Sequence, residues 1–386
     1  EMEMSWMQEY VKKSDCGLTF LQTKGDAVKT ILFSEEHFLK GKNIRPQFPG
    51  RNVGLMFGWE TSVNPFMQFP AYKEIADLPM GQKFEILKDP LFKKKLLSQE
   101  PDFESEIRAR LADNPSNKTR EEIAQDVALP TTITSNYKTQ FILGTPPNYE
   151  PKEEDSIAAI ASRKNISELE VMYDEMLQNQ GSNLIYAAFT PYEKYKLDFV
   201  EQAYRLKSSV AGGSDGGAHC GLICDASMPT TNISHWGRDR EAGRKFPLEM
   251  LIKKQTKDTA ETFGLFDRGE IKSGMLADIN IIDFDKLNVS HPTMIHDLPL
   301  GGRRLVQDAT GYIATIKNGQ VVSENGKANG VLPGKLIRGK QVCEVKSGIS
   351  EVSFFDKTIR LLAVKTLRFF WGLSGKSMKT TIVSET

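Results

Sequence analysis

The sequence is short of three things: net charge, cysteine and long apolar runs. Its 386 residues contain 50 Lys and Arg against 50 Asp and Glu, so the formal net charge is zero. A nucleic-acid-binding face requires clustered basic residues, and this balance gives no sign of one. No apolar run approaches the roughly 20 residues that cross a bilayer. We therefore expect neither a nucleic-acid partner nor a transmembrane segment.

Four cysteines in this length are too few for a disulfide framework and favour a reducing compartment. The first residues enter a mixed helical pattern and show neither the basic n-region nor the apolar h-region of a signal peptide. These two features predict a cytoplasmic protein. The sequence does not begin with Met, and we expect an upstream part that is not included in it.

What the sequence does contain is a glycine-rich turn around one carboxylate. GGSDGGAH occupies residues 212–219 and follows the run SSVA at 208–211, which predicts a short buried strand. The glycines allow the strand to end abruptly and leave Asp215 at its carboxyl end, followed by His219. Polar residues at that end of a buried strand are where the chemistry of α/β folds is found. An ordinary Asp-Gly turn is the alternative that the spacing leaves open.

Short apolar segments alternate with amphipathic helical ones before this turn. Strands are predicted at 17–22, 44–48, 53–57, 141–143, 184–189 and 208–211, and helices at 26–40, 154–178 and 198–206. This alternation indicates βα units and a parallel sheet. Ser167 is predicted to cap the second half of the helix at 154–178, with Glu170 as its capping-box partner. A polar, helix-rich stretch at about 84–130 predicts a helical insertion, either solvated or acting as a lid over a pocket.

After residue 265 the pattern changes to short strands and turns. Asn318 and Gly319 are a type I′ hairpin signal between two such strands. Residues 266–340 therefore predict a small β domain. The tail, residues 341–386, is a basic amphipathic helix candidate. Three alternatives stay open for it: contact with a membrane surface, covering of exposed apolar area, or foreign sequence without a role.

Motifs spread along most of the chain resemble amidohydrolase family 3, which includes the N-acyl-D-amino-acid deacylases. They are RPQ at 45–47, NVGLMFG at 52–58, GGSDGGAH at 212–219, ICDAS at 223–227, HWGRDR at 235–240, DRGEIKSGMLAD at 267–278, DLP at 297–299, GGRR at 301–304 and DATGY at 308–312. The resemblance covers roughly residues 15–339. It implies an α/β fold: the C-terminal half of a (β/α)8 TIM-type barrel over 1–265, then a small β-sandwich domain.

The resemblance assigns Asp215 the catalytic proton shuttle, with a contact to the metal as well. His219 is a second catalytic candidate that orients water or contacts substrate, with a backbone hydrogen bond as its alternative. Arg238 is a candidate for the substrate carboxylate, because a guanidinium grips carboxylates with two parallel bonds. Its alternative is a surface ion pair with Asp239. Trp236 is predicted to form a wall of the substrate pocket.

The metal centre is the part that this sequence does not supply. The resemblance implies zinc or another divalent metal, held in part by a His-x-His pair. None of the five histidines forms such a pair: His37, His219, His235, His291 and His296. Cys220 and Cys224 beside His219 suggest a soft metal site, although small buried thiols are the simpler interpretation. We expect the missing ligands upstream of Glu1.

The function implied is that of a metal-dependent hydrolase of carbon–nitrogen bonds other than peptide bonds, with N-acyl-D-amino acids or related N-acyl compounds as substrates. The alternative is a catalytically incomplete fragment or pseudo-enzyme that acts as a structural or interaction subunit. A half barrel has unpaired strand edges beside apolar faces, and such edges favour pairing with another chain. We therefore also expect self-association, as in a homo-oligomer.

Overall fold

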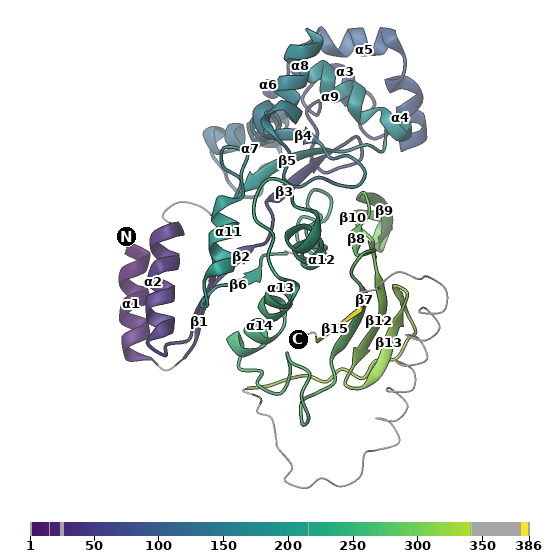
Figure 1. Cartoon of the computed structure of the whole chain (residues 1–386). Helices are drawn as coiled ribbons and strands as arrows, with labels where there is room; N and C mark the ends of the chain where they lie inside the picture. Colours follow the sequence, from purple (N-terminus) through teal and green to yellow (C-terminus); the bar gives the residue numbers. More distant parts are fainter. Residues whose placement is uncertain are drawn as a thin grey trace, which may run out of the picture. The chain divides into compact units, whose positions relative to one another are not determined.

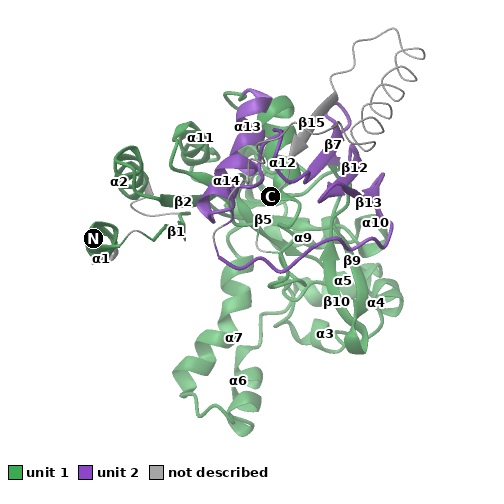
Figure 2. Cartoon of the chain, turned by 90° about the horizontal axis from the view of Figure 1, so that it is seen from below, with its two compact units in different colours: residues 1–246, 289–309 green, residues 247–288, 310–386 purple. Residues whose placement is uncertain are grey.

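The computed structural model describes residues 2–14, 16–23, 27–214, 216–339, 341 and 380–384. The chain divides into two compact units (Figure 2). Unit 1 comprises Glu1–Phe246 and Val289–Ala309, and unit 2 comprises Pro247–Asn288 and Thr310–Thr386. Most of the predicted amphipathic tail lies outside the described residues.

A three-stranded parallel sheet in unit 1 confirms part of the predicted βα pattern. Its order is β1 (Leu18–Leu21), β2 (Ile44–Pro49) and β6 (Val210–Gly212) (Figure 1). Helix α2 (Ala27–Leu39) connects β1 to β2, as predicted, and α1 (Met2–Lys13) packs beside it. Met7 and Val11 of α1 meet Phe33 of α2 and Ile44 of β2 in one buried apolar cluster. This cluster packs α1 and α2 against the start of β2.

The expectation that all the early strands join one parallel sheet is wrong. Strands β3 (Val53–Phe57) and β4 (Gln140–Ile142) both pair antiparallel with β5 (Ile185–Thr190) in a separate sheet. The alternation of predicted strands and helices gives the order of the elements along the chain. It does not tell which strands pair, or whether paired strands run parallel or antiparallel. Here Gly54 is essential to the pairing, since a Cβ on it would lie 1.7 Å from the Tyr186 ring.

The remaining helices of unit 1 follow β3 along the chain. The predicted helical insertion contains α4 to α7, and the predicted helix at 154–178 is broken at Asn165, which adopts φ 53°. Ser167 caps the next helix, as predicted, by accepting the N–H of Glu170 at 3.2 Å. The helices are α3 (Pro70–Lys73), α4 (Met80–Leu87), α5 (Pro90–Leu97), α6 (Phe103–Ala112), α7 (Arg120–Thr134), α8 (Ile157–Lys164), α9 (Glu168–Met176), α10 (Gln178–Gly181), α11 (Asp198–Arg205) and α12 (Met228–Ser234).

Small antiparallel sheets follow in the C-terminal part of the chain, as predicted. In unit 2 the strand order is β14 (Lys327–Ala328), β13 (Gln320–Glu324), β12 (Tyr312–Lys317), β7 (Ile279–Asp283) and β15 (Thr380–Ser384). Asn318 and Gly319 join β12 to β13 with φ values of 49° and 76°, which confirms the hairpin signal. Unit 1 holds a second pair, β9 (Thr293–Leu298) with β10 (Gly302–Val306). The short strands β8 (Asn288–Val289) and β11 (Ala309–Thr310) also pair.

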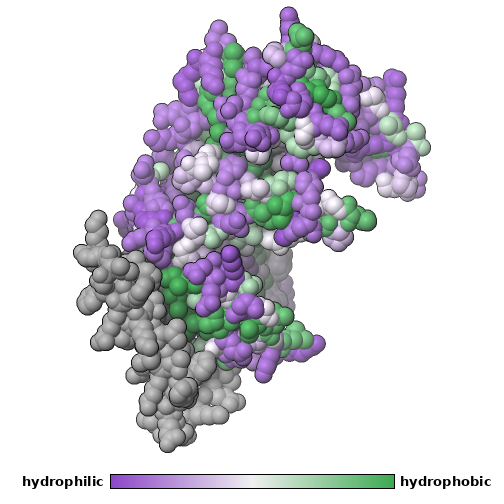
Figure 3. Space-filling model, turned by 90° about the vertical axis from the view of Figure 1, so that its right-hand side faces the viewer, coloured by the Kyte–Doolittle hydropathy of each residue, from purple (hydrophilic) through white to green (hydrophobic). Residues whose placement is uncertain are grey.

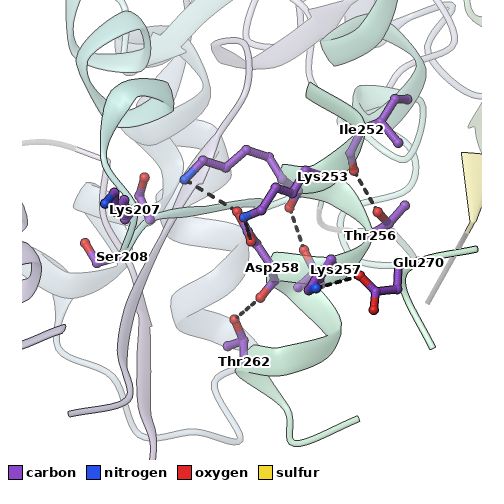
Figure 4. A network of polar contacts seen from close by, with 12 residues as sticks. Lys207, Ser208, Ile252, Lys253, Thr256, Lys257, Asp258, Thr262 and Glu270 are labelled. Atoms are coloured by element: carbon purple, nitrogen blue, oxygen red, sulfur yellow. Dashed lines mark hydrogen bonds and ion pairs between the residues drawn. The ribbon is translucent and has the colours of Figure 1, made fainter. Parts of the chain in front are cut away.

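The two helices of unit 2, α13 (Leu248–Gln255) and α14 (Lys257–Thr262), are joined by a buried carboxylate (Figure 4). Asp258 accepts a hydrogen bond from Lys253, and its backbone carbonyl accepts the Thr262 hydroxyl at 2.7 Å. Lys257 donates to Glu270 at 2.6 Å, which ties α14 to the loop that follows. A buried carboxylate satisfied in this way stabilises the junction between the helices.

No closed barrel is present among the residues that the structure describes: each of the strand sets above is an open sheet. The fold class is therefore mixed α/β. The half barrel that the resemblance implies stays a prediction. On the face drawn in Figure 3, hydrophobic areas are interspersed among predominantly hydrophilic side chains.

Candidate functional site

The carboxyl ends of β2 and β6 define the candidate site. These neighbouring strands are parallel, and Pro49 pairs with Gly212 at their last positions. Residues 50–52 and 213–219, which follow the two strands, therefore leave the sheet at the same edge, called here the carboxyl edge. Asp215 itself lies outside the described residues. Before and after it, Gly213 and Gly217 adopt φ values of 73° and 99°, a backbone conformation that favours glycine.

His219 lies on this edge, at the end of the glycine-rich turn. It is exposed and adopts φ 48°. Its carbonyl oxygen accepts the N–H groups of Leu222 and Ile223 at 2.7 and 2.9 Å. The backbone of His219 thus closes the turn that leads away from β6. Its catalytic role stays a prediction.

Trp236 lies behind the edge, in the interior of unit 1. Its side chain is fully buried, and its indole Nε1 donates to the carbonyl oxygen of Gly50 at 2.6 Å. The ring packs against Tyr204 and Phe246 and lies under the Arg240 guanidinium. Trp236 therefore holds the carboxyl end of β2 in place, and a direct contact with substrate stays a prediction.

Arg238 forms the ion pair with Asp239 that the sequence left open as the alternative to carboxylate binding. Its Nε and Nη2 donate to the two carboxylate oxygens of Asp239 at 2.6 and 2.8 Å. A side chain that is one-quarter exposed in such a pair stays within reach of a ligand. Carboxylate binding by Arg238 stays a prediction, and it requires the guanidinium to leave or share Asp239.

A buried ionic network beside Trp236 was not predicted from the sequence. Glu150 accepts His235 Nε2 at 2.8 Å and Arg240 Nε at 3.0 Å, and Arg240 Nη1 reaches Glu201 at 2.9 Å. Burial, the largest effect, raises the pKa of Glu150, but hydrogen bonds from His235 and Arg240 outweigh it and hold the pKa below its usual value of 4.5. Glu150 is 85 residues from His235 in sequence, so no local pattern signals the pair.

A second buried group lies directly at the end of β2. Arg51 is fully buried, and its Nη2 donates to Asp225 at 3.0 Å. Its guanidinium lies 3.5 Å from the centre of the Tyr149 ring. Burial, the largest effect, lowers the pKa of Arg51, yet Tyr149 and Asp225 more than offset it and keep the pKa above its usual value. This ion pair links β2 to the ICDAS motif of residues 223–227.

The cysteines next to this pair support the simpler of their two interpretations. Cys224 is buried, and burial, the largest effect, raises the pKa of its thiol to about 11. A protonated thiol is a poor metal ligand. Among the residues of the ranges described above, no three His, Cys, Asp or Glu side chains lie so that they could hold a metal ion. The described donors therefore do not fit a metal centre, and Asp215 is not among them.

The chain has a mixed α/β fold, and the loops that follow β2 and β6 leave the parallel sheet at the same end. Residues 168–323 match the model of the amidohydrolase family. The matched segment includes β5, β6, the glycine-rich turn and the HWGRDR motif. The resemblance that the motifs indicate is thus confirmed over this segment.

Two solved structures are similar to the chain. One is a D-aminoacylase described with a binuclear metal center, at 15% identity and a TM-score of 0.40, covering 86% of this chain and 52% of that one. The other is an N-acyl-D-glutamate deacylase from Bordetella bronchiseptica in complex with zinc and a phosphonate inhibitor, at 13% identity and a TM-score of 0.39, covering 85% and 52%. The chain spans about half the length of these proteins.

No curated protein sequence matches the chain. None of the helices in the described part of the chain is both long enough and apolar enough to span a bilayer.

Proposed function

We propose that the chain belongs to a hydrolase that cleaves carbon–nitrogen bonds other than peptide bonds, with N-acyl-D-amino acids or related N-acyl compounds as substrates. The observation that carries this proposal is the family match over residues 168–323, which includes the GGSDGGAH turn. Its support in the geometry is the pairing of β2 with β6, which brings the turn and residues 50–52 to one edge. Active sites of α/β folds lie at such edges.

Asp215 is the proposed proton shuttle of this reaction. Hydrolysis of an amide requires a proton to leave the attacking water and a proton to reach the departing nitrogen. A carboxylate that accepts the first proton and donates it to the nitrogen performs both transfers, and such general acid–base catalysis contributes about 10²–10⁴ in rate. His219, four positions further along the same turn, is proposed to orient the water or the substrate.

Arg238 and Trp236 are proposed to serve substrate binding. An N-acyl amino acid carries a free carboxylate, for which a guanidinium is the best-matched side chain. Arg238 already grips one carboxylate with two bonds, that of Asp239. The substrate carboxylate is proposed to compete with Asp239 for this position.

Zinc or another divalent metal is the cofactor that the proposal expects, and the described residues alone do not hold it. A catalytic zinc requires about three protein ligands. That shortage favours the second candidate, a non-catalytic subunit that has the amidohydrolase fold without its complete metal centre.

Metal content and turnover distinguish the two candidates. The purified chain is incubated with zinc and gel-filtered, its zinc is measured, and hydrolysis of N-acetyl-D-amino acids is followed with N-acetyl-L-amino acids as the matched control. Bound zinc with turnover supports the hydrolase. Absence of both supports the subunit and rejects the enzymatic proposal for these 386 residues.

A further inference from the structure

A π-helical turn follows α12 and changes which side chains face the same way. It covers His235–Asp239, and the N–H of Arg240 donates to the carbonyl oxygen of His235 at 2.8 Å. In an α-helix, residues five apart point about 140° away from each other. The wider π-helical turn brings them round to the same side. His235 and Arg240 thereby both reach Glu150, and π-helical turns occur frequently at functional sites.

The tautomer of a neutral His235 ring follows from this contact. Glu150 is buried, and four bonds from His235 and Arg240 fall on its two oxygens at 2.8–3.3 Å. Those bonds keep the pKa of this carboxyl below its usual value even though burial, the largest effect, raises it. An ionised carboxylate can only accept hydrogen bonds, so Nε2 of His235 must carry a proton. In the neutral imidazole, Nδ1 is then a bare acceptor.

His235 is the least buried member of the Glu150–Arg240–His235 set. Glu150 faces it from the loop before η2 (Glu153–Asp155), and Arg240 also bonds Glu201 of α11. The side chains of Glu150 and Arg240 are 3% and 2% exposed, whereas that of His235 is 19% exposed. The histidine is therefore the member of the Glu150–Arg240–His235 set that a ligand can reach.

The turn also belongs to the carboxyl edge. Trp236, the residue after His235, bonds the carbonyl of Gly50, the first residue after β2. Gly50 itself is packed so closely that a Cβ on it would lie 1.8 Å from Asn232 of α12. The helix and its π-helical turn are thus held against the end of β2, next to the strand that leads into residues 213–219.

We propose that Nδ1 of His235 accepts a hydrogen bond from an N–H donor of the ligand, the amide nitrogen of an N-acyl compound, and that Glu150 is the positioning residue that fixes the ring. This inference rests on the proposed function for the class of ligand. Sites built to bond a substrate N–H discriminate strongly against analogues that lack it, because the buried partner is left unpaired. The edge then recognises the amide nitrogen with His235, apart from any contact with the carboxylate.

Nitrogen NMR of the imidazole rings tests the proposal without relying on catalysis. The spectrum of the full chain, assigned with His235→Gln, is expected to show the Nε2–H form with an unprotonated Nδ1. N-acetyl-D-alanine is expected to shift the Nδ1 resonance, and N-acetyl-N-methyl-D-alanine, which lacks the N–H, is not. Glu150→Gln is expected to mix the two tautomers, while Glu154→Gln, a control on an exposed side chain, leaves them unchanged. An Nδ1–H form, or no response to the N–H probe, overturns the proposal.

Turnover separates this inference from the proposed function. If the chain hydrolyses N-acetyl-D-alanine, His235→Gln is expected to lower kcat/KM about threefold to tenfold, the effect of one hydrogen bond. His296→Gln is the matched control. The His296 side chain is half-exposed, and its Nε2 makes a long contact of 3.7 Å with the carboxylate of Glu60. Hydrolysis that His235→Gln leaves intact rejects the role of His235 and keeps the function. A chain that shows the NMR response without hydrolysis rejects the function and keeps the binding role.

Discussion

Trp236 donates its indole N–H to the carbonyl oxygen of Gly50 at 2.6 Å and thereby fastens the π-helical turn to the carboxyl end of β2. Both residues are buried, so neither group can turn to water instead. The bond explains how a residue in the interior contributes to a site at the edge of the sheet.

Loss of this bond is expected to destabilise unit 1. Trp236→Phe keeps most of the ring but leaves the Gly50 carbonyl without its donor, at a cost of about 1–3 kcal/mol. Trp236→Ala adds a cavity and is expected to cost about 3–5 kcal/mol. Urea unfolding followed by circular dichroism measures both. Trp6→Phe is the control at a side chain 49% exposed; equal effects of Trp6→Phe and Trp236→Phe would contradict this account.

Glu150 is expected to make stability depend on acid pH. Its pKa in the folded state is below the ordinary 4.5 because bonds from His235 and Arg240 outweigh burial. Its contribution is therefore present above pH 4.5 and is lost as the pH falls through the folded-state pKa. Glu150→Gln is expected to lower stability at pH 7, because buried Arg240 then keeps Glu201 as an ionic partner but loses Glu150. Unfolding free energies of the two proteins are expected to converge progressively as the pH falls below 4.5, and a gap that does not change with pH contradicts this role.

Cys224 is expected to resist alkylation. Burial, the largest effect, raises the pKa of its thiol to about 11, so about one thousandth of it is thiolate at pH 8. Cys16 is exposed and serves as the internal control. Iodoacetamide labelling followed by peptide mass spectrometry is expected to modify Cys16 first, with the difference abolished in denaturant. Rapid labelling of native Cys224 contradicts the packing described here and reopens the soft metal site with Cys220.

Self-association is expected from the strand edges. β1 and β6 are the end strands of the described parallel sheet, and Leu21 of β1 is 55% exposed. Such edges favour pairing with another chain. Size-exclusion chromatography with light scattering is expected to show oligomers whose fraction rises with concentration. A compact monomer at all concentrations contradicts the expectation.

The parts of the fold that depend on residues close together in the sequence could be predicted from local signals. The glycines around Asp215, the Asn318–Gly319 hairpin and the Ser167 cap are all read from residues within a few positions of one another. The antiparallel pairing of β3, β4 and β5 could not be predicted, since it depends on partners far apart in the sequence, in β3 and β5 more than a hundred residues apart, such as Gly54 and Tyr186.

The candidate site divides in the same way. Asp215 and His219 are visible in one motif, whereas Glu150 is recognised only once His235 and Arg240 lie beside it. Arg51 likewise gains its meaning from Asp225, which is 174 residues away. A charged residue without a local pattern is predicted to lie on the surface. Only the fold shows that Glu150 and Arg51 are buried.

The central claim is that Asp215 carries the proton in hydrolysis of an N-acyl compound, and one substitution tests it most directly. Turnover of N-acetyl-D-amino acids in the presence of zinc is compared for the unmodified chain, Asp215→Asn and Asp225→Asn, with folding checked by circular dichroism. The account predicts that Asp215→Asn lowers kcat by about 10²–10⁴ in a folded protein, whereas Asp225→Asn chiefly lowers stability. A folded Asp215→Asn protein that retains more than one-tenth of the turnover contradicts it.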